Sequence, residues 1–222
     1  YDVWVNGEQF TSEKPVIECG DGTATYDNGR VVLENATITY AHYVDSKAYG
    51  IYATSSLDIS VIGTNTISID KDDPTCGICV ECKEGWSLNI YGREESVLNI
   101  NVGSHNKDKS EAYAIYSNNN IKFGNISVNC NSTINGIGTL GTLYIDRDAR
   151  VISSALNGKA IDCGAFSFWN VNKDEFEVNE LSEMLCPDFE DNNISLQKIN
   201  KRNSNIDDSN NNKIQNIEKK LD

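Results

Sequence analysis

The 222-residue sequence lacks the features that mark several large protein classes. It has no run of 18 apolar residues, so it has no candidate transmembrane helix and we expect no membrane span. It has no visible signal peptide and begins at Tyr1, so we interpret it as a mature or excised part of a longer protein. No helical hydrophobic period occurs before about residue 179, which argues against a mainly helical fold.

Basic residues are also scarce. The chain has 19 Lys and Arg against 33 Asp and Glu, a net charge of −14, and 26 of those acids lie in residues 1–186. A body of this charge repels nucleic acid and anionic lipid, so we expect neither as a partner. A strongly acidic polysaccharide would need a bridging metal ion to bind directly.

Cysteines are present in an odd number, seven, without the regular spacing of a disulfide scaffold. Cys76, Cys79 and Cys82 form a C-x2-C-x2-C run that could hold a soft metal such as zinc, or an iron–sulfur cluster. The chain has no second CxxC and only two histidines, and residues three apart on a strand point to opposite faces. We therefore expect these cysteines to be free thiols, with a metal site or a local disulfide as alternatives.

What the chain does contain is a repeated phrase, in which a small residue is followed by isoleucine. The five isoleucines are Ile51, Ile78, Ile115, Ile137 and Ile161. Short alternating runs follow each phrase, and alternation with a period of two predicts half-buried strands. Repeats of 20 to 50 residues predict stacked units that bury a shared core. We therefore predict an all-β fold, a right-handed parallel β-helix of about five to seven rungs. A β-sandwich is the alternative, although it gives no reason for the same strand order to recur.

The composition changes near the C-terminus. Residues 1–186 form the predicted β-helix domain with its caps, and residues 187–222 form an Asn-rich linker or tail with little to bury. A short helix over 213–221 would need a docking surface to be stable. The prediction for this region is a mostly unstructured or short-helical tail.

Several N-terminal segments carry a family resemblance. They are YDVWVNG at 1–7, GTATYD at 22–27, LENATI at 33–38 and GTNTI at 63–67. The sequence resembles β-solenoid domains, often described as carbohydrate-binding, of large surface or secreted proteins from anaerobic gut bacteria. The resemblance covers roughly residues 1–170 and implies a right-handed parallel β-helix in an extracellular, multidomain protein. It implies no catalytic residues.

Outward-facing aromatic residues are the first candidate binding site. Tyr52 and Tyr116 occupy one register two rungs apart, with Cys79 between them, and Tyr144 faces out of its own strand. Flat aromatic faces beside Asn and Asp suit sugar rings. We predict Tyr52, Tyr116 and Tyr144 as ligand-binding residues for a carbohydrate.

Acidic turns offer a second chemistry. Asp70, Asp72 and Asp73 are candidate ligands for calcium, the one cofactor that we consider. Many pectin-cleaving enzymes of this fold use calcium and a basic residue, and here Arg147 or Arg150 lies near Asp146 and Asp148. No series of acids converges with a base on consecutive rungs.

These observations favour a monomeric, non-enzymatic surface or secreted module that binds carbohydrate or acts as an adhesin-like domain, with no required cofactor. The alternatives are an enzyme resembling polysaccharide lyases or hydrolases, and a purely structural stalk.

Overall fold

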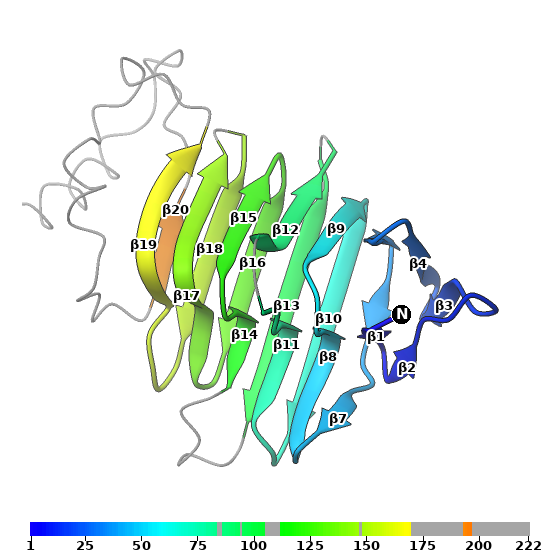
Figure 1. Cartoon of the computed structure of the whole chain (residues 1–222). Helices are drawn as coiled ribbons and strands as arrows, with labels where there is room; N and C mark the ends of the chain where they lie inside the picture. Colours follow the sequence, from blue (N-terminus) through cyan, green and yellow to red (C-terminus); the bar gives the residue numbers. More distant parts are fainter. Residues whose placement is uncertain (84–85, 94, 105–111, 147, 170–192, 197–222) are drawn as a thin grey trace, which may run out of the picture.

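The computed structural model describes residues 1–83, 86–93, 95–104, 112–146, 148–169 and 193–196. This part of the chain is all-β, as predicted, and contains no helix. Its strands form one sheet of 14 strands and one of six, which lie alongside each other over the length of the molecule (Figure 1). The N-terminal strands lie at one end, and β19 lies at the other (Figure 1).

Three parallel ladders make up most of both sheets. The first ladder consists of β8 (Lys47–Ala53), β11 (Thr75–Val80), β14 (Tyr113–Ser117) and the first parts of β17 (Asn135–Asp146) and β19 (Ile161–Trp169). It pairs Ile51 with Ile78, Ile78 with Ile115, Ile115 with Ile137, and Ile137 with Ile161. The stacking of the five repeated isoleucines is therefore confirmed.

The second ladder follows the first along the chain and belongs to the same sheet. Its strands are β5 (Arg30–Glu34), β9 (Leu57–Ile62), β12 (Trp86–Gly92), β15 (Asn120–Gly124) and the last parts of β17 and β19. Its inward column, in consecutive pairings, consists of Leu57, Leu88, Ile121, Leu143 and Phe166. The residues between these inward positions face outwards and form the surface described below.

The third ladder forms the six-stranded sheet. Its parallel strands are β6 (Thr37–Ile38), β10 (Thr64–Lys71), β13 (Val97–Ser104), β16 (Ser127–Ser132) and β18 (Arg150–Ala155). Inward Ile67, Ile100, Val128 and Val151 are fully buried. On its outer face, Asn129 donates a side-chain hydrogen bond to Asn99, and Asn131 donates one to Asn101.

Antiparallel strands complete the two sheets. At the N-terminal end they are β1 (Val3–Val5), β2 (Glu8–Gln9), β3 (Val16–Cys19), β4 (Gly22–Asp27) and β7 (His42–Val44). At the other end β20 (Asn193–Leu196) pairs antiparallel with β18. Both sheets are therefore mixed, and the structure supports the all-β class without establishing the narrower parallel β-helix.

The C-terminal prediction needs one correction. Residues 193–196 belong to the segment expected to be an unstructured linker, yet they form β20 against β18. Alternating apolar residues such as Ile194 and Leu196 give these four residues a strand pattern. The rest of the predicted tail, including the helix over 213–221, lies outside the described residues.

The small residue before each isoleucine has a packing reason. A Cβ atom on Gly50 would lie 2.8 Å from Cγ2 of Ile67, and one on Gly77 would lie 2.5 Å from Cγ2 of Ile100. The first ladder therefore approaches the third so closely at this position that little or no side chain fits between them. The repeated phrase marks this close approach on successive rungs.

The glycine before the isoleucine also interrupts the alternation of side chains between the two faces of the strand. At Gly77 the Cα–Cβ direction points towards the third ladder, and the next residue, Ile78, is also in the core. Cys76 and Cys79, three residues apart, consequently lie in one cluster on the outer face with Tyr49 and Tyr52. The expectation that cysteines at this spacing point to opposite faces is wrong for this pair.

Candidate functional site

The predicted tyrosine platform is largely closed at Tyr52. Its side chain lies on the outer face as expected, but only 6% of the residue is exposed. Trp4 of β1 pairs with it across the strands, and the rings of His42 and Tyr49 lie within 5.9 Å and 4.6 Å of its ring. Its hydroxyl donates a 3.0 Å hydrogen bond to Oε2 of Glu81. Tyr52 is therefore a packed member of an aromatic cluster and does not offer an open face to a sugar.

Tyr116 and Tyr144 are more accessible, but they belong to different ladders. Tyr116 is half-buried, its ring 5.1 Å from that of Tyr113, and it flanks Cys79 from the side opposite Tyr52. Tyr144 is half-buried in the second ladder, where it pairs with Lys122. The three predicted tyrosines thus do not converge on one site.

The three cysteines of the C-x2-C-x2-C run also separate. A hydrogen bond with Cys76, followed by burial, raises the pKa of the Cys79 thiol well above its ordinary value. Cys82 lies elsewhere, where its backbone N–H donates to Oδ1 of Asn118 and its sulfur accepts from Asn119. All three are free thiols. No group of three or more Cys, His, Asp or Glu side chains in the described ranges is arranged to hold a metal ion.

The predicted calcium ligands lie at the corner between β10 and β11. The carboxylate of Asp70 occupies the space above Gly103, and Asp72 is exposed. The backbone carbonyl of Asp73 accepts hydrogen bonds from the hydroxyls of Thr75 and Ser104. These contacts explain a structured turn and do not place the three carboxylates around a common point.

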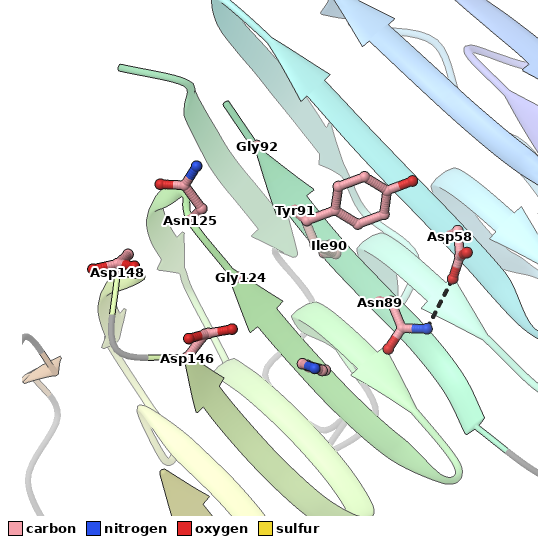
Figure 2. A pocket seen from close by; sticks show the side chains of 10 residues that line it. Asp58, Asn89, Ile90, Tyr91, Gly92, Gly124, Asn125, Asp146 and Asp148 are labelled. Atoms are coloured by element: carbon pink, nitrogen blue, oxygen red, sulfur yellow. Dashed lines mark hydrogen bonds between the residues drawn. The ribbon is translucent and has the colours of Figure 1, made fainter. Parts of the chain in front are cut away.

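A groove on the outer face of the second ladder does bring polar side chains together. It has a volume of about 530 Å³ and crosses β9, β12, β15 and β17 (Figure 2). Its lining residues are Asp58, Asn89, Ile90, Tyr91, Gly92, Lys122, Gly124, Asn125, Asp146 and Asp148. The groove therefore combines an aromatic ring with carboxylates, amides and one amine, the side chains that proteins use to recognise small polar ligands.

The pairing of the strands sets the positions of these side chains. One outward column of the second ladder contains Asp58, Asn89 and Lys122 on successive strands. The next outward column, two residues further along each strand, contains Tyr91, Gly124 and Asp146. The Nδ2 group of Asn89 donates a 2.8 Å hydrogen bond to Oδ1 of Asp58, which holds both side chains against the sheet (Figure 2). Rungs of a parallel ladder repeat about every 4.8 Å, so two rungs span about 10 Å.

Tyr91 is held at one end of the groove. The guanidinium carbon of Arg30 lies 5.5 Å from the centroid of its ring, within the range of a cation–π contact. Burial raises the pKa of the Tyr91 hydroxyl, while the Arg30 charge acts in the opposite direction. The ring is half-buried and projects beside Asp58 and Asn89 (Figure 2).

Gly124 is an unusual glycine. Every other glycine in the described ranges either has a positive φ or would bring a Cβ atom within about 3 Å of a neighbour. Gly124 has neither constraint, because the atoms nearest to its Cβ would be Asp146 Oδ2 and Tyr91 Cβ, both at an ordinary 3.8 Å, and Asp146 Cβ at 4.0 Å. Gly124 is the last residue of β15, directly before Asn125, which has a positive φ. Glycine in a strand marks a bend or a site where a ligand or another backbone approaches closely. The missing side chain leaves the hollow between Tyr91 and Asp146 open.

Sequence reasoning found part of this groove but not the site. The sequence drew attention to Asp146 and Asp148, and Leu88, Ile121 and Leu143 occupy equivalent positions of successive repeats, which pair in the second ladder. Moving three residues along from each of these leads to Tyr91, Gly124 and Asp146. The signal was therefore present in the alignment of the repeats. Of the basic residues proposed for a lyase site, Arg150 is exposed at the start of β18 and Arg147 lies outside the described residues.

Comparisons with protein-family models, curated proteins and solved structures gave no significant match. Among the residues that the structure describes, no helix is long and apolar enough to cross a membrane.

Proposed function

We propose that this chain is a non-enzymatic carbohydrate-binding module, built as a right-handed parallel β-helix of about five rungs. Three parallel ladders that recur in the same order along the chain support this fold, as does the right-handed preference of parallel crossovers. The resemblance of residues 1–170 to β-solenoid domains of bacterial surface proteins supports an extracellular role in a larger protein. The antiparallel strands at each end then act as caps of the solenoid.

The ligand site of this proposal is the groove of the second ladder. The single observation that carries it is Gly124, a strand glycine that no backbone angle or close neighbour requires. Its position between Tyr91 and Asp146 opens space where an aromatic face and hydrogen-bonding groups meet. A sugar ring needs this combination, because one face of the ring is apolar while its edge carries hydroxyls.

The size of the groove favours a short stretch of a polysaccharide. Tyr91 and Asp146 are two rungs apart, about 10 Å, which is the scale of a disaccharide. One stacked ring contributes about 1 kcal/mol beyond the burial of its area, by analogy with aromatic pairs. Binding by one module is therefore weak, and multivalent display on a surface protein would make it useful.

A glycan array with the full chain, followed by titration calorimetry on the best oligosaccharides, tests the proposal. The key variant is Gly124→Thr, whose side chain would fill the hollow while suiting a strand. We expect at least tenfold weaker binding, with unfolding stability equal to or above that of the wild type. Tyr91→Ala should also weaken binding, by about fivefold, since it removes the stacking ring.

Ser68→Thr is the matched control, because Ser68 is an exposed strand residue on the outer face of β10, away from the groove. It should leave binding unchanged. Absence of binding to every glycan would reject the proposal and favour a structural stalk. Binding that survives both Gly124→Thr and Tyr91→Ala would place the site elsewhere, for example on the half-buried Tyr116.

A lyase-like enzyme is the second candidate, and one observation favours it. The groove brings Lys122 together with Asp58, Asp146 and Asp148, so it contains a basic residue beside several carboxylates. Calcium-dependent appearance of unsaturated products from uronic-acid polymers, lost in Lys122→Ala, would establish it. Without such products the binding-module proposal is retained.

A further inference from the structure

The third ladder has an uncharged surface on its outer face, on the strands β13, β16 and β18. We call it the neutral lane, and its residues are Asn99, Asn101, Asn129, Asn131, Ile152 and Ser154. They form two outward columns, and Ser195 and Asn193 of β20 continue these columns in register. Two charged residues border the lane, Asp70 over Gly103 and Arg150 at the start of β18. In a chain of net charge −14, this face favours an uncharged ligand, because a charged one would lose water there without gaining an opposite charge.

Hydrogen bonds between rungs hold the amides of the lane in place. Nδ2 of Asn129 donates to Oδ1 of Asn99 over 2.9 Å. Nδ2 of Asn131 donates to Oδ1 of Asn101 over 3.1 Å, and Oδ1 of Asn131 accepts a 2.7 Å bond from the hydroxyl of Ser154. An amide has two N–H donors and an oxygen with two lone pairs, so these bonds leave further donors and acceptors for a ligand. The lane therefore presents hydrogen-bonding groups whose orientation is set before binding.

A hollow of about 480 Å³ opens beside the lane, at the corner that follows β16 and β18. Asn131 and Ser154 line it together with Leu156, of which 70% is exposed. The backbone N–H of Leu156 donates a 3.0 Å hydrogen bond to the carbonyl of Ser132, which fixes this apolar residue beside the polar ones. A sugar ring has an apolar face and a hydroxyl-bearing edge, so the hollow suits one ring at the border of the lane.

The spacing of the lane matches an extended glycan chain. Equivalent residues on neighbouring strands lie about 4.8 Å apart, and the two columns lie about 6.6 Å apart along each strand. Two rungs span about 10 Å, the scale of a disaccharide, so the rings of an extended chain recur about once per rung. We infer that the neutral lane is a second binding surface, which holds one extended, uncharged polysaccharide chain along the axis of the stack. This surface belongs to the other sheet from the groove, and ligand binding there does not depend on the groove.

A second copy of this chain is a poorer occupant of the lane. Stable protein interfaces have an apolar core, and Ile152 is the only apolar residue among the six of the lane. Two copies would also bring together two bodies that each have a net charge of −14. A hydroxyl-rich polymer satisfies the amides without either cost.

Binding of the full chain to two insoluble neutral polysaccharides, amorphous cellulose and chitin, tests the inference. Depletion of the protein from solution after the polysaccharide is sedimented measures the affinity. The measurement is made in Gly124→Thr, in which the groove is filled, so that binding by the lane is observed alone. We expect Gly124→Thr to bind at least one of the two, with an affinity that changes less than about twofold with salt, because no ion pair is involved.

Asn101→Asp, added to Gly124→Thr, is the key variant. Its carboxylate keeps the oxygen that accepts from Asn131, so the urea midpoint should not change, but it removes the amide donors and places a charge in the lane. Binding should weaken at least about fivefold, the scale of one lost neutral hydrogen bond. Asn28→Asp in the same background is the matched control. It adds the same charge at an exposed turn between β4 and β5, outside the lane, and should leave binding unchanged.

Several outcomes would overturn the inference. If Gly124→Thr bound neither polysaccharide, the groove would remain as the one proposed site. If Asn101→Asp bound as tightly as its parent, the amide ladder would serve only to stabilise the stack. A wild-type dimer that dissociates in Asn101→Asp, measured by analytical ultracentrifugation, would assign the lane to a second copy. By contrast, loss of polysaccharide binding in Asn101→Asp, with oligosaccharide binding unaffected by Gly124→Thr, would support the lane and reject the groove.

Discussion

Two glycines on outwardly similar strands should respond oppositely to the same substitution. Gly77 in β11 and Gly124 in β15 both lack a positive φ, and both lie in parallel ladders of the larger sheet. In each case the change to alanine adds one methyl group. The structure predicts that this methyl group is harmful at Gly77 and harmless at Gly124.

The distances give the size of the difference. At Gly77 the new Cβ would lie 2.5 Å from Ile100 Cγ2 and 2.6 Å from the backbone oxygen of Ala114, so both the ladder and the core must shift. Overpacking of this kind costs about 1–3 kcal/mol. At Gly124 the nearest atoms are 3.8 Å away, and alanine in a strand is favoured over glycine by about 0.5–1 kcal/mol.

Urea unfolding followed by circular dichroism measures both effects on the full chain. We expect the midpoint to fall for Gly77→Ala and to stay or rise for Gly124→Ala, with unchanged slopes. The first ladder offers an internal comparison, since Ala114 occupies the register of Gly77 on the next rung. At that rung the third ladder has the smaller residues Cys130 and Ser132 in the registers of Ile100 and Val102, so the Cβ atom of Ala114 is accommodated.

Two results would refute this reasoning. If Gly77→Ala were neutral, the close approach of the first and third ladders would not explain the repeated small residue. If Gly124→Ala destabilised the protein as much as Gly77→Ala, Gly124 would have a structural role, and the argument for a ligand groove would lose its main support.

Three further predictions concern the core, the aromatic cluster and the thiols. Ile115→Asp should unfold the protein, because an unpaired carboxylate at a fully buried position costs several kcal/mol, and retention of the wild-type circular dichroism spectrum would contradict the stacked core. Tyr52→Ala should lower the free energy of unfolding by about 2–4 kcal/mol through lost packing with Trp4 and Tyr49. Tyr52→Phe should cost only about 1 kcal/mol, because it removes only the hydrogen bond to Glu81. Folded Tyr52→Phe should bind glycans as tightly as the wild type, and a loss of binding would return Tyr52 to the binding site. Burial raises the pKa of the Cys19 thiol from its ordinary 9.0 to about 11, so the unfolded chain loses this proton at a lower pH than the folded chain. The contribution of the protonated thiol to the free energy of unfolding should therefore be fully present below pH 9 and lost as the pH rises through 11. Urea midpoints at several alkaline pH values check this, and Cys19→Ala should show a smaller decline than the wild type.

Much of the architecture could be predicted because strand formation and ladder register leave local marks. Alternating residues define the inward face of each strand, and the repeated phrase before Ile51, Ile78 and Ile115 aligns the rungs. Each inward residue stacks on its equivalent from the neighbouring rung, so aligning the repeats is equivalent to aligning the strands. The β20 strand was missed because four residues in a polar segment give too short a pattern.

The site could not be predicted in the same way. Tyr52 was expected to be open, but Trp4 of the N-terminal strand β1 and His42 of β7, the hairpin partner of β8, cover it. No local pattern shows which segment will cover an outward side chain. The expectation that Cys76 and Cys79 point to opposite faces was wrong for a related reason. The close approach at Gly77 depends on Ile100, which belongs to another ladder.

The sequence by itself therefore determined the all-β class, the strands and the stacking of the isoleucine ladder, because these follow from the period of apolar residues and from repetition. Only the tertiary structure decided which outward residues remain open, and that Asp58, Tyr91, Gly124 and Asp146 share one groove. The physical reason is that a groove depends on side-chain volumes on neighbouring rungs and on the segments that cover them. Both are set by packing between parts of the chain that are far apart in the sequence.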